Sequence, residues 1–527
     1  MLNISKFIDS IRSQSKQATP KYPYNAQGYY VVDNKFEQNR PNSRVTVITP
    51  VYNAEKFLRK TIDSVINQSL GMESIEYILV DDHSTDSTRD ILLEYSSKFE
   101  NIIAIFMKNN SGTPGRPRNI GMEHATSPYI TFLDADDWLE PHGLEVLHRI
   151  LEETGDDYVV GKTIKVERKK TSTIGEHESC KERRSVSPFS IPHIFNHLGP
   201  RARMFRTTIV RENHIQFPEM KFAEDKQFFI DILIHSKSIS TTKVPIYYLN
   251  RLDNSQTRLT NQTNILQKTD CNLKVIRYIL DKDIDINKKK LILNRLYEFD
   301  SINRFFMTPH YEKTKLKRLY YTKFNKVIKT TQSLEYEIAD EFMIPTNKVK
   351  YDLLRTKKYR DLEKLVIWEK NEKVKEVYIR DQLPYNVAPI TNENNKYIRI
   401  PMYATLLDDS FNMDMYSLKF KVYGDHLDNI TDILFQKWND AHVEFTVPVN
   451  VDSDGNGLLK VSLEQLSKFP ASSYSVFLRY NDYMKTNIRK TDQTPLIHQY
   501  NDLEFSLIQT SFSNIALKIS TKKSTYL

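Results

Sequence analysis

Acidic residues stand at the ends of two predicted strands and at the start of a predicted helix. The strands cover residues 77–80 and 129–133, and the helix begins near residue 224. In an open α/β sheet, ligands bind beyond the carboxyl ends of the strands, so acids placed there face a shared crevice. Such a crevice suits a nucleotide and a divalent cation. The acids are Asp81 and Asp82 after the first strand, Asp134, Asp136 and Asp137 after the second, and Glu224 and Asp225 in the helix.

The motif Asp134-Ala135-Asp136 is the candidate metal site. Two carboxylates one residue apart can hold a hard cation that also binds phosphate oxygens, so we expect Mg²⁺ or Mn²⁺ there. The alternative interpretation is an acidic turn that caps a helix starting near Pro141.

The elements that position these acids alternate between strand and helix. Short β-branched runs and amphipathic segments follow one another from residue 44 to about residue 160. This pattern predicts parallel βαβ units in an α/β domain. The segment 109–119 contains two prolines and two glycines, so we expect a loop there.

The rest of the chain changes period twice. Residues 263 to about 375 are mostly helix-patterned, and beyond about residue 395 apolar residues recur at every second position, which is typical of a small β-sandwich. A chain of 527 residues is expected to form two to four domains. The predicted parts are an N-terminal extension (1–43), the α/β domain (44–262), a helical linker or support (263–394) and the β-sandwich (395–527).

Composition excludes some classes of protein. With 39% hydrophobic and 27% charged residues the chain is of the globular type, and no apolar run approaches the ~20 residues that span a bilayer. Cys180 and Cys271 have no metal-ligand spacing, which favours a reducing compartment. The N-terminus has no secretory signal pattern, so we expect cytoplasmic residence. Apolar residues at helical spacing in the first eleven positions either rest on the inner face of the membrane or pack on the first domain.

Basic residues crowd the stretch 165–206, which we call the basic stretch. It would suit a polyanionic partner. Nucleic acid is not favoured, since no DNA- or RNA-binding motif accompanies these residues, and a solvated loop is the bland alternative. Its members are Lys165, Arg168, Lys169, Lys170, Lys181, Arg183, Arg184, Arg201, Arg203 and Arg206.

Three motifs together resemble the family 2 glycosyltransferases of the GT-A fold. They are Val-Ile-Thr-Pro-Val-Tyr-Asn at 47–53, Val-Asp-Asp-His-Ser-Thr-Asp at 80–86 and Asp-Ala-Asp-Asp at 134–137. The resemblance covers about residues 44–258. Within the family, the segments 112–119, 217–219 and 223–225 are most similar to the enzymes that place β-N-acetylglucosamine on the ribitol phosphate of staphylococcal wall teichoic acid. The resemblance implies a Rossmann-like nucleotide-sugar domain, a helical linker and an all-β, immunoglobulin-like C-terminal sandwich that mediates trimer formation.

The resemblance also implies roles for single residues, all of them tied to a UDP-sugar donor. The predicted base takes the proton of the acceptor hydroxyl, and its neighbour orients the acceptor or the sugar. The matched positions are Pro50, Tyr52 and Asp82 around uracil, Asn110, Arg118 and Asn119 toward the uridine and diphosphate, Asp134 on ribose and sugar, Asp136 on the metal, Asp225 as base and Glu224 beside it.

Asp225 has a second interpretation. Inverting transfer needs a carboxylate within hydrogen-bond reach of the attacking hydroxyl, and Asp225 can serve. Glu224 and Asp225 also lie in the first turn of the helix that holds Phe228 and Phe229, where acids stabilise the helix dipole.

The segments 247–251 and 254–257 resemble the family's mobile loop, which closes on the diphosphate, and this loop departs from the family pattern at one point. The related enzymes place a His there, followed two residues later by Ser, whereas this chain has Ser255-Gln256-Thr257-Arg258. Arg251 or Arg258 could supply a cation instead.

The first hypothesis is an inverting, metal-dependent glycosyltransferase that uses a UDP-sugar, with an N-acetylhexosamine as the expected sugar, and whose acceptor is an anionic cell-wall polymer bound along the basic stretch. A neutral capsular or lipid-linked glycan is the alternative acceptor. A non-catalytic glycan-binding scaffold is the alternative from another class. For the sandwich we expect a homo-oligomer interface, although Tyr474, Tyr480 and Tyr483 could stack on sugars.

Overall fold

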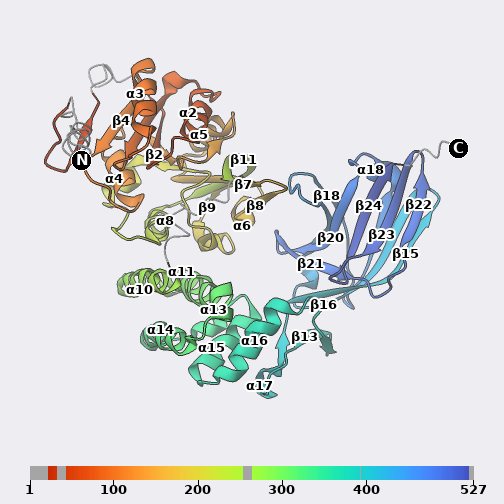
Figure 1. Ribbon diagram of the computed structural model, residues 1–527. Helices are drawn as coiled ribbons and strands as arrows, with labels where there is room; N and C mark the ends of the chain where they lie inside the picture. The colour runs from red at the N-terminus through yellow and green to blue at the C-terminus, as the bar shows by residue number, and fades with distance from the viewer. Residues whose placement is uncertain (1–21, 33–42, 253–263, 392, 522–527) are drawn as a thin grey trace, which may run out of the picture.

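The computed structural model describes residues 22–32, 43–252, 264–391 and 393–521. Figure 1 shows three parts: an α/β domain in red to yellow-green, a group of helices in green to teal, and an all-β part in blue. The predicted N-terminal amphipathic helix and the loop 254–258 lie outside the described residues. Within the described residues, no helix combines the length and the apolar character needed to cross a membrane.

The α/β domain is built on one twisted sheet with the strand order β1-β4-β3-β2-β5-β10-β7-β11-β6. Strands β2 to β5 are parallel, as predicted, and continuous apolar runs bury them on both faces. Because β2 lies between β3 and β5, the strand order reverses there, and ligands bind at such a reversal. The strands are β1 (Tyr29–Val31), β2 (Val45–Val51), β3 (Ile75–Asp81), β4 (Ile102–Met107), β5 (Tyr129–Phe132), β6 (Trp138–Leu139), β7 (Tyr158–Glu167), β10 (Arg203–Arg206) and β11 (Ile239–Arg251).

Helices cover both faces of the sheet (Figure 1). They carry the apolar spacing that the sequence showed; Leu58, Ile62 and Val65 of α2, for example, are all buried. The helices of this domain are α2 (Leu58–Ile66), α3 (Thr88–Lys98), α4 (Gly115–His124), α5 (Gly143–Thr154), α7 (Thr207–Glu212) and α8 (Glu224–His235).

The expectation that 109–119 is a loop throughout is wrong at its end. Helix α4 begins at Gly115, with Pro114 as its N-cap and Pro117 in its first turn. Proline is tolerated there because the first N–H groups of a helix have no intrahelical partner. Only residues 109–114 form the loop.

Part of the predicted N-terminal extension belongs to the sheet. Strand β1 pairs antiparallel with β4, with Tyr30 opposite Phe106, and the two rings stack at 5.3 Å between centroids. Arg116 of α4 also donates to the Gln27 carbonyl at 2.8 Å. The extension therefore covers one edge of the sheet.

The helical region is joined to the α/β domain by a shared hydrophobic core. Phe228 and Phe229 of α8 belong to the same buried cluster as Leu273 and Ile276 of α10 and Leu353 of α15. A π-helical segment, Arg295–Asn303, continues α11. The other helices of eight or more residues are α10 (Ile265–Asp281), α11 (Ile286–Asn294), α14 (Lys317–Thr330), α15 (Pro345–Arg355) and α16 (Tyr359–Asn371).

The C-terminal part is a β-sandwich with its own core. Tyr474 and Tyr480 are buried in that core, so the suggestion that they stack on sugars is wrong. A three-stranded sheet of β12 (Val377–Arg380), β13 (Leu383–Val387) and β14 (Tyr397–Arg399) precedes it. The sandwich strands are β15 (Met402–Asn412), β16 (Met415–Gly424), β17 (Ile430–Lys437), β18 (Glu444–Pro448), β19 (Asn456–Ser462), β20 (Ser472–Tyr480), β21 (Met484–Arg489), β22 (Leu496–Tyr500), β23 (Leu503–Gln509) and β24 (Ile515–Thr521).

The basic stretch forms strands and a helix, and most of its charged side chains have partners, so the alternative of a solvated loop is wrong. It forms β8 (Thr171–Ile174), α6 (Glu176–Ser179), β9 (Arg183–Val186) and β10. Arg203 is buried and lies 2.9 Å from Glu178. Lys181 and Arg183 both contact Asp482 of the sandwich, at 2.7 and 3.5 Å. Part of this stretch therefore joins the α/β domain to the sandwich, whose strands lie beside it in Figure 1.

Candidate functional site

The predicted site residues lie at the carboxyl edge of the parallel strands. Pro50 stands at the end of β2, Asp82 follows β3, and Asp134 follows β5. These are the strands next to the reversal of strand order, so the topology gathers residues that are more than 80 positions apart. Tyr52 is 51% exposed, which leaves its ring open to a ligand.

Arg118 links three elements at the centre of the site. It lies on α4, is only 3% exposed, and donates from Nη2 to Asp134 Oδ1 at 2.7 Å. Its Nη1 lies 3.7 Å from Glu224 Oε1 at the start of α8. The Phe217 ring packs against the guanidinium, 5.3 Å from its carbon. A buried cation thus holds two of the predicted acids, and its Nε has no hydrogen-bond partner.

The first turn of α8 presents Glu224 and Asp225 side by side. Burial raises the pKa of Glu224, the neighbouring Asp225 raises it further, and Arg118 lowers it. The Lys226 backbone N–H donates to Asp225 Oδ1 at 2.8 Å, which fixes the orientation of that carboxylate. The preceding Ala223 has a φ of 71°, a left-handed conformation that strains a non-glycine residue.

Tyr247 of β11 fastens the turn that contains the Asp-Ala-Asp motif. Its hydroxyl donates to Asp137 Oδ2 at 2.6 Å and accepts from the Asp134 N–H at 3.1 Å. The Asn250 N–H donates to Asp137 Oδ1 at 2.7 Å. Burial, followed by the charges of Asp136 and Asp134, raises the pKa of Asp137 well above its usual range. Asp137 is therefore a structural acid. The resemblance assigned Tyr247 to a mobile loop, and this is wrong, because Tyr247 lies in strand β11 and holds the turn.

The donor set around Asp136 suits a cation that is shared with a phosphate ligand. In the part of the chain that the structure describes, no group of three His, Cys, Asp or Glu side chains could hold a metal alone. Mg²⁺ commonly binds through one or two carboxylates and completes its shell with water and substrate phosphates. Asp134, Asp136 and Asp137 place three carboxyl groups within four positions of the chain, and a cation would relieve their mutual repulsion.

Asp82 and the loop after β4 form the far side of the site. Ser111 donates to Asp82 from its backbone N–H at 2.7 Å and from its hydroxyl at 2.9 Å, and Asn110 donates to the Asp82 carbonyl at 2.8 Å. Burial raises the pKa of Asp82 to about 6 even though the Ser111 bonds lower it. Two predicted residues, Asp82 and Asn110, are thus brought into direct contact.

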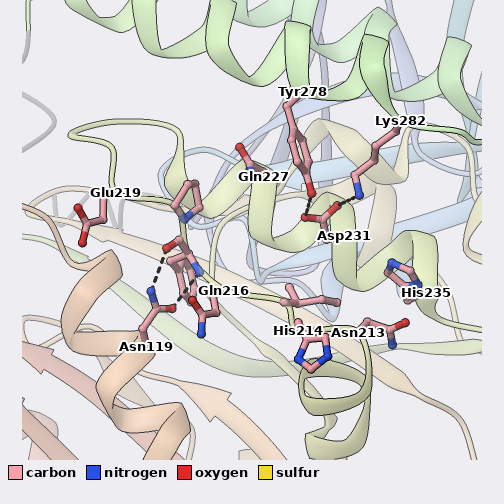
Figure 2. A pocket seen from close by; sticks show the side chains of 13 residues that line it. Asn119, Asn213, His214, Gln216, Glu219, Gln227, Asp231, His235, Tyr278 and Lys282 are labelled. Carbon is pink, nitrogen blue, oxygen red and sulfur yellow. Dashed lines mark hydrogen bonds and ion pairs between the residues drawn. The ribbon is translucent and has the colours of Figure 1, made fainter. Parts of the chain in front are cut away.

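The side chain of Asn119 bonds the backbone beside the site and not the group of acids around Arg118. It bonds the Phe217 backbone in both directions, each at 2.9 Å, and lines a cavity of about 370 Å³ between α4, α8 and α10 (Figure 2). Arg251 donates to the neighbouring Asn250 carbonyl at 2.5 Å. Among the described residues, neither Asn119 nor Arg251 contacts the acids around Arg118. Their roles in donor binding stay predictions.

Sequence comparisons find the same family that the motifs suggested. Residues 46–213 match the family model of glycosyl transferase family 2. The chain is 35% identical to a poly(ribitol-phosphate) β-glucosyltransferase of Bacillus spizizenii, over 39% of this chain and 32% of that protein. It is 33% identical to TarP of Staphylococcus aureus, a poly(ribitol-phosphate) β-N-acetylglucosaminyltransferase, over 39% of this chain and 62% of that one. The chain spans about a third of the length of the first of these relatives.

Solved structures extend the likeness to the whole fold. The crystal structure of S. aureus TarS gives a TM-score of 0.56 at 19% identity, over 92% of this chain and 86% of that one. A shorter TarS structure in complex with UDP-GlcNAc gives a TM-score of 0.56 at 22% identity, over 67% of this chain and 99% of that one. The GT-A-like α/β domain and the C-terminal β-sandwich are confirmed, and residues 46–213 are the part that matches the family 2 glycosyltransferase model.

Proposed function

We propose that this protein is an inverting glycosyltransferase that moves a sugar from a UDP-sugar to a hydroxyl of a ribitol phosphate polymer of the wall teichoic acid type. The observation that carries the proposal is the convergence of Arg118, Asp134, Glu224 and Asp225 from three elements at the reversal point of the sheet. The relatives named above act on poly(ribitol phosphate), and TarS has been crystallised with UDP-GlcNAc.

Donor binding would use the edge formed by β2, β3 and β5. The Asp82 carboxylate can accept a hydrogen bond from the N3–H of uracil, with Pro50 and the exposed ring of Tyr52 flanking the base. Asp134 would meet the ribose and the sugar while Arg118 holds its other oxygen in place. Asp136 would hold Mg²⁺ or Mn²⁺. When bound, the cation would stabilise the charge that grows on the departing diphosphate.

Asp225 would take the proton of the attacking hydroxyl. Its carboxylate is oriented by the Lys226 N–H, and the hydroxyl becomes more acidic as it bonds to the anomeric carbon. A carboxylate in this place can therefore accept the proton late in the step. Glu224 stands beside it, and its raised pKa favours the neutral form, which can donate a hydrogen bond to the sugar or the acceptor.

The acceptor is the part of the proposal with the least support from this chain. The basic stretch was expected to bind the polymer, but Lys181 and Arg183 contact Asp482 and Arg203 contacts Glu178. This pairing favours a second candidate, a transferase with the same donor chemistry and a neutral capsular or lipid-linked glycan as acceptor.

The proposal is tested by measuring UDP release from UDP-N-acetylglucosamine, UDP-N-acetylgalactosamine and UDP-glucose. Each donor is combined with ribitol or glycerol teichoic acid or with no polymer, and with Mg²⁺, Mn²⁺ or chelator. We expect polymer-stimulated release with one donor, and Asp225→Asn should lower kcat by about 100- to 10,000-fold. Asp283→Asn, at an exposed position outside the site, is the control. A parental rate from Asp225→Asn would refute the proposed base, and no release from any donor would favour the scaffold hypothesis.

Self-association and location complete the proposal. Large apolar side chains are exposed on the sandwich, namely those of Leu407, Met413, Leu458 and Ile497, which supports a homo-oligomer formed through this part. Sedimentation at several concentrations tests it, and a monomer at every concentration would refute it.

A place at the inner face of the cell membrane suits a donor made in the cytoplasm, and fractionation of cells that express the protein tests it.

A further inference from the structure

Helix α8, which carries the predicted base, is held by the helical region at two points. Near its C-terminal end, Asp231 accepts from the Tyr278 hydroxyl at 2.7 Å and lies 3.0 Å from Lys282 Nζ, both on α10 (Figure 2). In its first turn, Lys226 Nζ lies 2.6 Å from Asp300 Oδ1. The side chains of Lys226 and Asp300 are 7% and 0% exposed, so this second contact is almost completely shielded from water.

Asp300 is a buried carboxylate that contacts three cations, of which Lys226 is also buried, while the side chains of Arg295 and Arg304 are 15% and 26% exposed. Arg304 Nη2 lies 2.8 Å from Oδ1 and Arg295 Nε 3.5 Å from Oδ2. Burial alone would raise the pKa of Asp300, but Arg295, Lys226 and Arg304 more than offset it and hold that pKa below its usual range. Asp300 therefore remains charged, and its removal would leave three cations without their shared partner.

The π-helical segment explains how Asp300 reaches α8. In a π-helix residue i bonds residue i+5, which brings Arg295 and Asp300 onto one face. The same segment is anchored elsewhere by Glu298, which accepts from the Met343 and Ile344 N–H groups at 3.0 and 2.6 Å. Segments of this kind are rare and often occur at functional sites.

A continuous chain of contacts runs from Asp300 to the predicted base. Asp300 holds the Lys226 side chain, and the Lys226 backbone N–H donates to Asp225 Oδ1 at 2.8 Å. The turn begins at Ala223, whose left-handed backbone persists only where its surroundings enforce it. The anchor on Lys226 and the Arg118–Glu224 contact together hold the first turn in its strained entry.

We propose that Asp300 is a positioning residue for glycosyl transfer, which acts through Lys226 to hold the Asp225 carboxylate in line with the acceptor hydroxyl. The helical region is then a working part of the active site. This inference rests on the proposed function. It assigns no contact between Asp300 and substrate, so donor binding should not depend on it.

The test uses the full chain and begins with UDP release by the wild type. Asp300→Asn should lower kcat by about 10- to 100-fold, since a displacement of ~1 Å can cost 100-fold in rate, while KM for the donor stays within about twofold. Lys226→Met should have the same effect. Glu298→Gln is the matched control: it removes a buried carboxylate of the same π-helical segment that faces α15 rather than α8, so it should lower the melting temperature and leave kcat unchanged.

A double variant separates positioning from general damage. If Asp300 acts through Lys226, the kcat of Asp300→Asn with Lys226→Met should lie within about twofold of either single variant, because the contact can be lost only once. Multiplied losses would overturn the inference, and so would parental kcat in Asp300→Asn. If Asp300→Asn shows no cooperative melting, Lys226→Met decides: a parental kcat in that variant overturns the inference. A wild type that releases no UDP would instead refute the proposed function itself.

Discussion

The α/β domain meets the rest of the chain along two surfaces, and both use charge. Against the helical region the contact is Lys226–Asp300, with side chains 7% and 0% exposed. Against the sandwich, one contact is Lys181–Asp482, with side chains 50% and 33% exposed, and Arg183, 8% exposed, contacts the same carboxylate. Exposed ion pairs contribute little to stability, about 0–1 kcal/mol, whereas breaking a buried pair leaves an uncompensated charge. The first surface therefore binds the two parts into one unit, and the second can change at little cost.

Truncation should give the largest effect. A chain that ends at Asn264 loses Leu273 and Ile276 from the core that also holds Phe228, so we expect it not to melt cooperatively. A chain that ends at Ile400 loses the sandwich and its contacts with the α/β domain, and should keep cooperative melting and UDP release within about twofold. Calorimetry and donor turnover measure both. If the shorter chain folded and the longer one did not, the comparison of the two surfaces would be reversed.

Arg203→Met tests a buried charge within the basic stretch. The variant leaves Glu178 buried without its cation, although His197 still contacts it, so the free energy of unfolding should fall by about 3–5 kcal/mol. Urea unfolding measures the change. A loss below 1 kcal/mol would mean that the Arg203–Glu178 pair contributes little to stability despite its burial.

A pH series tests the raised pKa of the buried Glu224 carboxyl. Burial raises the pKa of Glu224 above its ordinary value of 4.5. Above that value the folded state keeps a proton that the unfolded state has lost, so stability falls as the pH rises. Glu224→Gln removes this cost: its melting temperature should equal that of the wild type below pH 4.5 and exceed it by a few degrees near pH 8. A difference that is the same at both pH values would contradict the raised pKa.

Lys181→Gln should give the smallest effect. The pair with Asp482 is half exposed, so we expect a change below about 1 kcal/mol in unfolding free energy and no change in kcat. Urea unfolding and donor turnover check this. A loss of activity would show that the sandwich surface, too, communicates with the site.

The sequence predicted the parts of the site that depend on local pattern. The apolar runs of β2 to β5 have strand spacing, and the acids after them form recognisable motifs, so Asp82 and Asp134 could be placed at one edge before any coordinates. Asp225 could be placed at the start of α8 for the same reason. What makes these residues a site is the topology that joins them, and the alternation of strand and helix already indicated it.

The rest depended on contacts between distant segments. The charge count of the basic stretch did not reveal that Arg203 is buried against Glu178, because pairing is decided by the fold. Pro117 suggested a loop although the first turn of a helix accepts proline. Asp300 had no local signal, and Tyr247 was assigned to a loop, since each acts on a residue more than 70 positions away.

Strand β1 protects the molecule from aggregation through the edge of its sheet. It occupies the backbone N–H and C=O groups of β4 from Ile105 to Met107. An uncovered edge strand is a template on which another chain can add by hydrogen bonding. A shortened protein that started at Ser43 would bare this edge and invite copies to stack strand to strand. Strand β1, which lies before the family motifs, thus protects β4 from pairing with a strand of another copy.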